Sequence, residues 1–156
     1  VEEGKIVLDR GDDMTGVTWR GDVPARVNYV IELEAQRVAG NDFFCGLTFP
    51  VGDDPCSLIC GGWGGGVTGL SSLDGEDAAH NETSQWINYD KDRWYRIRLR
   101  VTESSIQAWL DDKQIVEVST VGRKIGIRSE VDPSKPLGIS TWRTTGAIRN
   151  IRMRKL

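Results

Sequence analysis

Apolar residues alternate with polar ones in short runs along most of the chain, and clusters of turn-forming residues separate these runs. No long segment places apolar residues at the i, i+3, i+4 and i+7 positions that mark one face of a helix. Period-two alternation is typical of β-strands that bury one face and expose the other. The pattern predicts strands at residues 5–10, 16–20, 27–37, 42–49, 56–61, 66–70, 85–89, 94–101, 105–110, 114–118, 123–129, 137–141 and 147–155.

So many strands in a chain of 156 residues must form two packed sheets or a closed barrel. The length suits one domain with its own core, and neither a linker nor an internal repeat divides the chain. We therefore expect residues 1–156 to form a single β-sandwich domain, and we expect this domain to be part of a larger protein.

One predicted hairpin joins strands 42–49 and 56–61 through the turn at 51–55. A symmetrical pairing sets Phe49 opposite Cys56, Leu47 opposite Leu58 and Cys45 opposite Cys60. These six residues, together with Phe43, are expected to share one core face. The pairing also brings Cys45 and Cys60 close enough for a disulfide, although directly opposed strand neighbours have poor geometry for one.

A second hairpin joins strands 94–101 and 105–110. Pairing Val101 with Ile106 makes one face apolar, with Leu99 opposite Ala108 and Ile97 opposite Leu110. On the other face Arg98 meets Trp109 as a cation–π pair, and Arg96 meets Asp111 as an ion pair. One face of this hairpin is thus expected in the core and the other in solvent.

Composition narrows the function. The net charge is −3 and the basic residues are scattered, which argues against a nucleic-acid partner. No apolar run approaches the roughly 18 to 20 residues that span a bilayer. The three cysteines cannot all pair, and one histidine is too few for a typical zinc site, so buried free thiols are the favoured interpretation. Six tryptophans and eighteen glycines are a composition common among sugar-binding β-sandwiches.

The strand motifs resemble known families. Residues 94–101 (WYRIRLRV) and 106–112 (IQAWLDD) resemble the "W-y-x-i-x-i-x-v … i-x-v-y-l-D-G" hairpin of laminin G-like and other concanavalin A-like domains. Residues 122–127 and 147–154 resemble the "G-x-i-G-l … v-x-f-r-N-I-r-i-r" ending of the bacterial 3-keto-disaccharide hydrolase domain family. Residues 24–37 resemble the "p-x-x-Y-x-l-x-v-e-x-x-R" strand of the same domains.

This resemblance implies an all-β fold, a two-sheet antiparallel jelly-roll sandwich of the concanavalin A-like kind. It also implies a carbohydrate partner and a secreted or extracytoplasmic location. Residues 41–47 depart from the "n-S-G-i" strand of the hydrolase family. That departure, and the absence of a known catalytic motif, favour binding without turnover over an enzyme.

Candidate ligand-binding residues come from three segments that combine aromatic and planar polar side chains, the mixture that binds sugars. A tryptophan lies within the glycine-rich segment 61–66, a long acidic loop follows at 71–84, and a Trp-Arg pair ends strand 137–141. The predicted site consists of Trp63, Asp74, Asp77, His80, Asn81, Glu82, Trp142 and Arg143.

Several alternatives stay open at this level. The carboxylates of Asp74, Glu76 and Asp77 are spaced closely enough to suggest calcium, which takes six to eight oxygen ligands. A glycoside-acting hydrolase or lyase would use Asp77, His80 and Glu82 as acid and base. A non-catalytic protein-interaction domain is the third possibility. The tryptophans could equally be core residues, and the acidic loop could be a solvated surface loop.

Overall fold

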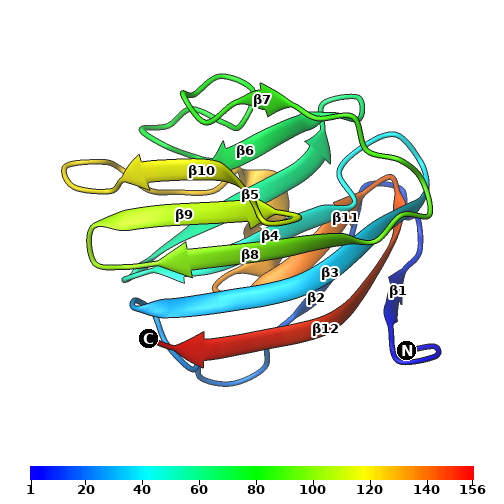
Figure 1. Ribbon diagram of the computed structural model, residues 1–156, viewed down its shortest axis with the longest axis horizontal. Helices are drawn as coiled ribbons and strands as arrows, with labels where there is room; N and C mark the ends of the chain where they lie inside the picture. Colours follow the sequence, from blue (N-terminus) through cyan, green and yellow to red (C-terminus); the bar gives the residue numbers. More distant parts are fainter.

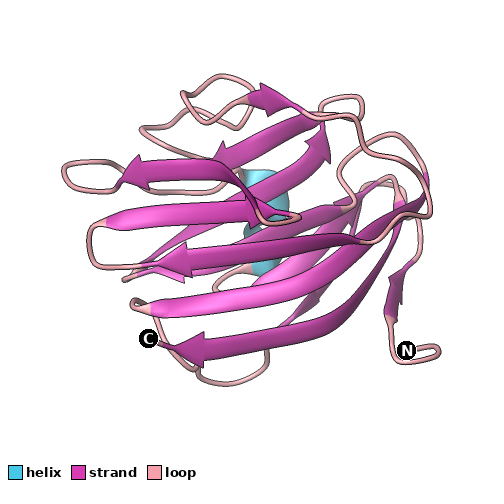
Figure 2. Cartoon of the chain, in the orientation of Figure 1, coloured by secondary structure: helices cyan, strands magenta, loops and turns pink.

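The computed structural model describes all 156 residues and consists of two six-stranded antiparallel sheets packed face to face (Figures 1 and 2). The first, which we call the β3 sheet, has the order β1 (Ile6–Leu8), β12 (Thr145–Lys155), β3 (Tyr29–Ala39), β8 (Tyr95–Val101), β9 (Ser105–Leu110), β10 (Lys113–Ser119). The second, the β5 sheet, has the order β2 (Met14–Thr18), β11 (Gly138–Trp142), β4 (Cys45–Val51), β5 (Asp54–Gly62), β6 (Val67–Ser71), β7 (Gln85–Trp86). The predicted all-β, two-sheet antiparallel sandwich is confirmed.

The core lies between the two sheets, where alternate side chains of each strand point inward. Strand β8 alternates strictly between buried and exposed residues along its whole length. The main cluster contains 26 buried apolar residues drawn from both sheets, among them Tyr29, Phe44, Phe49, Leu58 and Leu99. All three cysteines are buried in this cluster as free thiols. The sequence interpretation of buried free thiols is therefore confirmed, and the alternative Cys45–Cys60 disulfide does not form.

Both predicted hairpins form in the predicted register. Cys45 pairs with Cys60 in the first, and Val101 pairs with Ile106 in the second. Phe43 was wrongly assigned to the core face. It precedes β4, where pleat alternation no longer fixes its direction, and it packs on the outer face of the β5 sheet.

The polar face of the second hairpin is confirmed in part. The guanidinium of Arg98 lies 4.2 Å from the ring centre of Trp109, as predicted. The ion pair of Arg96 was wrong in its partner, because Arg96 pairs with Asp112 and Arg93 pairs with Asp111. Asp111 instead accepts a hydrogen bond from the backbone N–H of Arg96 through its second carboxylate oxygen.

The strand expected at 123–129 is also wrong. This segment lies along the acidic loop, where Ser72 and Gly126 exchange backbone hydrogen bonds and Leu73 and Ile125 form an isolated bridge. The apolar alternation is real, since Ile125 packs on the main core and Ile127 on the outer cluster. Beyond this single bridge the segment does not pair with any strand. It continues into the short 3₁₀ helix η1 (Ser129–Ser134).

The outer face of the β5 sheet carries a second, smaller apolar cluster. Its buried members are Phe43, Ile59, Ala78 and Val131, which come from the segment before β4, from β5, from the acidic loop and from η1. Helix η1 approaches β11 at Gly138, where an added Cβ would lie 2.6 Å from the carbonyl oxygen of Ser134. The acidic loop and η1 are thus both anchored on this face. No helix of the structure is long and apolar enough to cross a membrane.

Candidate functional site

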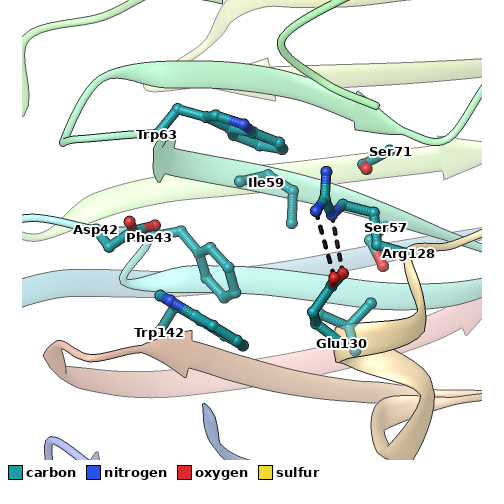
Figure 3. Close-up of a pocket in the computed structure, with 10 residues that line it drawn as sticks. Asp42, Phe43, Ser57, Ile59, Trp63, Ser71, Arg128, Glu130 and Trp142 are labelled. Atoms are coloured by element: carbon teal, nitrogen blue, oxygen red, sulfur yellow. Dashed lines mark hydrogen bonds and ion pairs between the residues drawn. The ribbon is translucent and has the colours of Figure 1, made fainter. Parts of the chain in front are cut away.

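A cavity of about 210 Å³ opens on the outer face of the β5 sheet (Figure 3). It lies beside the second apolar cluster and contains both aromatic and charged side chains. The lining residues are Asp42, Phe43, Ser57, Ile59, Trp63, Ser71, Arg128, Glu130, Val131 and Trp142. Two predicted site residues, Trp63 and Trp142, therefore come together in one cavity, although 79 positions separate them in the sequence.

Trp63 occupies a strained backbone position in the loop between β5 and β6. Its φ of 48° is in the left-handed region, which a bulky side chain rarely adopts and which costs roughly 1–2 kcal/mol. Gly64 and Gly65, with φ of 92° and 133°, complete a turn that only glycine adopts easily. The turn leaves Trp63 37% exposed, and the guanidinium of Arg128 lies 5.5 Å from its ring centre. Strain of this kind concentrates at binding sites.

Trp142 forms the wall opposite Trp63, as Figure 3 shows. It is the last residue of β11, and its backbone N–H donates to the carbonyl of Phe43 at 3.1 Å. The ring centroids of Trp142 and Phe43 are 6.4 Å apart, and the two rings are tilted relative to each other. Phe43, Ile59 and Val131 are each at least 90% buried and form an apolar floor between the walls.

Arg37 holds two cavity segments together from beneath. This arginine of β3 is 5% exposed, and its Nη2 lies within hydrogen-bonding distance of three backbone carbonyls. The distances are 2.9 Å to Asp42, 3.0 Å to Gly61 and 2.9 Å to Gly65. The guanidinium also stacks on Phe44. Because Asp42 and the glycine loop of Trp63 share this donor, Arg37 fixes the position of one relative to the other.

Asp42 brings a carboxylate to the same cavity. Its backbone N–H donates to Thr144 Oγ1 at 3.0 Å, and its Oδ1 accepts a hydrogen bond from the backbone N–H of Phe43 at 2.8 Å. Partial burial raises the pKa of this carboxyl, and this effect outweighs the backbone hydrogen bonds and the charges of Arg37 and Arg143 that favour ionisation. No ion pair engages Asp42.

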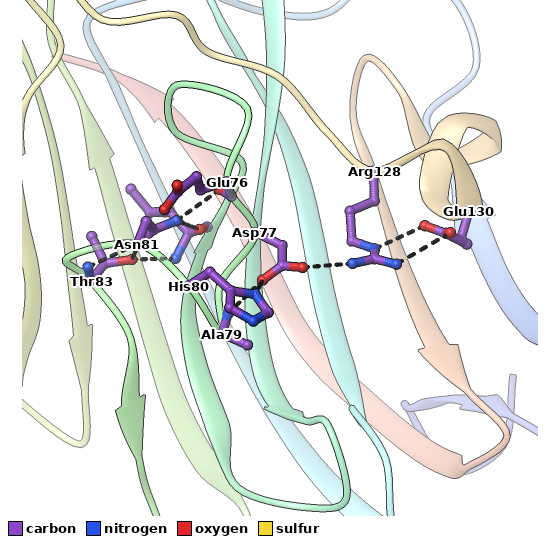
Figure 4. Close-up of polar contacts among 9 residues, drawn as sticks. Glu76, Asp77, Ala79, His80, Asn81, Thr83, Arg128 and Glu130 are labelled. Atoms are coloured by element: carbon purple, nitrogen blue, oxygen red, sulfur yellow. Dashed lines mark hydrogen bonds and ion pairs between the residues drawn. The ribbon is translucent and has the colours of Figure 1, made fainter.

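Arg128 forms the far end of the cavity and links the acidic loop to η1 (Figure 4). Its Nη1 donates to Asp77 at 2.7 Å, and its Nε and Nη2 donate to the two carboxylate oxygens of Glu130 at 2.9 and 3.3 Å. The hydrogen bonds from Arg128 lower the pKa of Glu130. Burial opposes ionisation of Asp77, but hydrogen bonds from His80 and the Ala79 N–H, together with Arg128, lower its pKa.

A serine hydroxyl in the cavity lacks any partner. Ser71 is 1% exposed, and its Oγ makes no hydrogen bond. The neighbouring Ser57 differs, because its Oγ bonds to Thr48 Oγ1 at 2.7 Å. A buried hydroxyl without a partner costs free energy, so native structures rarely contain one without a reason such as a ligand or bound water.

The other predicted site residues lie around the cavity rather than in its lining. Arg123 pairs with both Asp74 and Glu82 and so ties the acidic loop to the segment before η1. Asn81 organises the loop: its Nδ2 donates to the carbonyls of Leu70 and Glu76, and its Oδ1 accepts from the N–H and hydroxyl of Thr83.

Two further candidates are exposed. His80 is bonded to Asp77 at 2.7 Å and is largely in solvent. Arg143 pairs with Asp13 on the surface, although its guanidinium lies 5.9 Å from the ring centre of Trp142. Asp77 does not line the cavity; it contacts Arg128, which does.

The proposed calcium ligands do not converge. Asp74 is bound by Arg123, and Asp77 by Arg128. The structure contains no group of three His, Cys, Asp or Glu side chains that could hold a metal ion. The calcium site stays a prediction without a preformed ligand set.

Sequence reasoning missed Asp42, Arg128 and Glu130. Asp42 and Glu130 are single carboxylates with no partner at catalytic spacing in the sequence, and Arg128 was assigned to a strand. The sequence holds a weak sign that Arg128 is not an ordinary strand residue. The alternating pattern ends there with a pair of opposite charges, Arg128 and Glu130, and Pro133 follows. Only the fold reveals that these residues share a cavity.

Residues 11–154 match the model of the 3-keto-alpha-glucoside-1,2-lyase-like domain family. The chain belongs to this family. The match covers nearly the whole chain and confirms the resemblance drawn from the strand motifs. No curated protein shows significant sequence similarity to this chain.

Solved structures share the fold of this lyase-like domain at low identity. A carbohydrate-binding module, CBM66 from Bacillus subtilis, is 11% identical with a TM-score of 0.57, covering 97% of this chain and 96% of that one. A family 16 glycosyl hydrolase from Mycobacterium smegmatis is 12% identical with a TM-score of 0.57, covering 97% and 76%. The Crh5 transglycosylase in complex with NAG is 9% identical with a TM-score of 0.63, covering 97% and 72%. The fold is therefore a jelly roll, which this chain shares with structures of a carbohydrate-binding module, a glycosyl hydrolase and a transglycosylase.

Proposed function

We propose that this domain binds a saccharide in the cavity between Trp63 and Trp142. The observation that carries the proposal is the pair of indoles on opposite walls of one cavity, whose lining also includes Ser71, a buried residue with an unpartnered hydroxyl (Figure 3). Indole faces cover the apolar C–H face of a pyranose ring, while polar side chains take its hydroxyl groups. The volume of about 210 Å³ is below the range of roughly 300–1,000 Å³ typical of drug-sized ligands, and suits one sugar unit.

The polar groups stand at two ends of the cavity. Asp42 offers an acceptor on one side, and Arg128 with Glu130 offers donors and acceptors on the other. The acidic loop contributes by fixing Arg128 through Asp77. This division of an aromatic centre and polar ends supports recognition of a ring by stacking, with orientation set by its hydroxyl groups.

A glycan-array screen followed by calorimetry tests the proposal. We expect Trp63→Ala and Trp142→Ala each to weaken binding of the best glycan by at least about tenfold, since stacked aromatic residues dominate such sites. Trp19→Ala is the matched control, because Trp19 is 52% exposed and does not line the cavity. Binding that survives both cavity variants, or a screen without any hit, would refute the proposal and would favour a protein-interaction domain.

The same screen repeated with EDTA tests the calcium alternative. Calcium would have to draw Asp74 and Asp77 away from Arg123 and Arg128. Binding that ignores EDTA would assign recognition to the tryptophan walls and the Arg128 network alone. Binding abolished by EDTA would support a metal held by Asp74, Glu76 and Asp77.

Turnover of the saccharide is the second candidate function. Burial raises the pKa of Asp42, and hydrogen bonds lower that of Glu130, within the same cavity. Two carboxyls whose environments separate their pKa values are the usual arrangement of an acid and a base. Asp77, His80 and Glu82 are the alternative set suggested by the sequence.

Glycoside and 3-keto-glycoside substrates, assayed with Asp42→Asn and Glu130→Gln, test for turnover. If the cavity is catalytic, both variants lose activity while still binding the saccharide. If His80→Ala and Glu82→Gln are instead the variants that lose activity, the acidic-loop residues are the catalytic set.

We further propose an extracytoplasmic location and attachment to other domains, in keeping with a carbohydrate partner.

A further inference from the structure

We infer that the outer face of the β3 sheet is a second binding site, which takes an acidic saccharide chain carrying both carboxylates and hydroxyl groups. This face lies on the opposite side of the sandwich from the cavity of Trp63 and Trp142, so the inference goes beyond the proposed function and does not depend on it. It rests on arginines that are scattered in the sequence but gather on one face of the fold.

Strand geometry brings the arginines together on β8 and β12, which flank β3 (Figure 1). Strand β8 has an exposed arginine at every second position, and the residues between them are in the core. In a regular β12, Arg149 and Arg152 would face opposite sides, because three positions separate them. A bulge with one extra residue restores the phase, and both face outward as partners of two glutamates of β3. The outer face therefore carries Arg96, Arg98, Arg100, Arg149, Arg152 and Arg154.

Most of this positive charge has no partner in the protein. Two of the arginines form ion pairs with carboxylates beside them, Asp112 and Glu34. The arginines that form no ion pair are Arg98, Arg100, Arg152 and Arg154. The strands of this sheet offer only two further carboxylates on the same face, Glu32 and Glu117. A chain of net charge −3 thus presents one face with an excess of guanidinium groups, which attract anionic ligands.

Glu32 indicates what kind of anion fits. In the register it lies directly between Arg98 and Arg152, yet it forms an ion pair with neither. The side chains line a cavity of about 420 Å³, within the range of roughly 300–1,000 Å³ typical of ligand sites. A dense polyanion would place negative charge against Glu32, which is unfavourable. A uronate sugar offers carboxylates to the arginines and hydroxyl donors to Glu32.

The same cavity contains the aromatic and planar polar groups that bind sugars. Trp109 is half-buried in its lining, with the guanidinium of Arg98 4.2 Å from the ring centre. Asn150 occupies the bulge of β12 with a φ of 55°, and its amide donates a hydrogen bond to Glu34. An indole, an amide and unpaired guanidinium groups together favour an acidic glycan over other anionic partners.

Calorimetry at low ionic strength tests the inference with oligogalacturonate, with alginate oligosaccharides, and with the neutral methyl esters of both. We expect the acidic chains to bind at least about tenfold more tightly than their esters, because charge-assisted hydrogen bonds are the stronger ones. High salt should remove most of this advantage, since it screens exposed charges. Absence of binding by both acidic chains, or equal binding of acid and ester, would overturn the inference. Tighter binding of duplex DNA than of either uronate chain would overturn the assignment to a glycan.

The double variant Arg98→Gln/Arg152→Gln locates the site, with Arg10→Gln/Arg20→Gln as its matched control. Both double variants remove the same charge, but Arg10 and Arg20 are exposed residues outside the strands of this face. We expect the first to weaken binding of the acidic chains at least about tenfold, and the control to change it less than about twofold. Equal weakening by both would show an effect of net charge alone and would overturn the site.

The cavity variants separate this inference from the proposed function. Trp63→Ala and Trp142→Ala should leave binding of the acidic chains intact, because these residues lie on the other sheet. Loss of acidic-chain binding in the tryptophan variants, with the arginine double variant unaffected, would overturn the second site and support the cavity. Acidic chains that bind through the arginines, in a protein whose cavity variants change no glycan binding, would refute the proposed function alone.

Discussion

Replacing Arg37 by methionine would remove the donor that joins two cavity segments while keeping a long, flexible side chain in its place. The structure sets the size of the effect. The carbonyls of Asp42, Gly61 and Gly65 would each lose a charged donor at 2.9 to 3.0 Å. Leaving a buried polar group unpaired costs roughly 1–3 kcal/mol, which favours a large loss of stability. Burial lowers the pKa of Arg37, which shows that the charged side chain is desolvated. Methionine avoids this desolvation cost, so the net loss is smaller than the sum over three carbonyls.

We therefore expect a loss of about 3 kcal/mol in the free energy of unfolding, a large part of the 5–15 kcal/mol typical of a domain. Urea unfolding measures this loss directly, and the melting temperature should fall by roughly 6–12 °C for a domain of this size. Arg37→Lys should recover only part of the loss, because its ammonium also has three donors for the three carbonyls but is carried on a shorter side chain and lacks the planar guanidinium that lies over Phe44. Saccharide affinity, measured where the variant is still folded, should fall as well. A loss below about 1 kcal/mol with affinity intact would refute the clamp role.

Three further predictions concern backbone strain, pH and thiol chemistry. Trp63→Gly should be more stable than Trp63→Ala by about 1 kcal/mol in urea unfolding, because only glycine relieves the left-handed φ, although both variants lose binding. The lowered pKa of Asp77 means that its ionised form stabilises the fold above pH 4, and that this contribution disappears as pH falls through the folded-state pKa. Asp77→Asn should thus be less stable than the wild type at neutral pH, and the difference should disappear as pH falls through the folded-state pKa of Asp77, as followed by urea unfolding. Burial raises the pKa of Cys56 and Cys60 to about 12, so these thiols should react with a disulfide reagent only at the rate of unfolding.

The sequence predicted the strands well because a half-buried strand repeats its polarity every two residues. Strands β9 and β8 match the expected ranges within one residue, and both hairpins have the expected register, since short turns fix it locally. The errors arose where alternation continued without a partner strand, as at 123–129, and where a residue such as Phe43 lies just outside a strand.

The cavity itself was only half predictable. Trp63 and Trp142 stood out by residue type and by their glycine-rich and strand-end settings. Asp42 and Glu130 have no local feature that distinguishes them from other surface carboxylates in the sequence. Their roles depend on burial and on contacts with Arg37 and Arg128, which are distant in the chain and are set by the packing of the two sheets.

The separation of the two apolar clusters has a consequence for protein engineering. Phe43, Ile59 and Val131 contact the cavity, whereas the main core between the sheets is built from other residues. These three floor positions can therefore be randomised together without disturbing the packing between the sheets on which folding of the sandwich depends. Libraries at these three positions, displayed on the otherwise unchanged domain, would select binders for new sugars from a single stable scaffold.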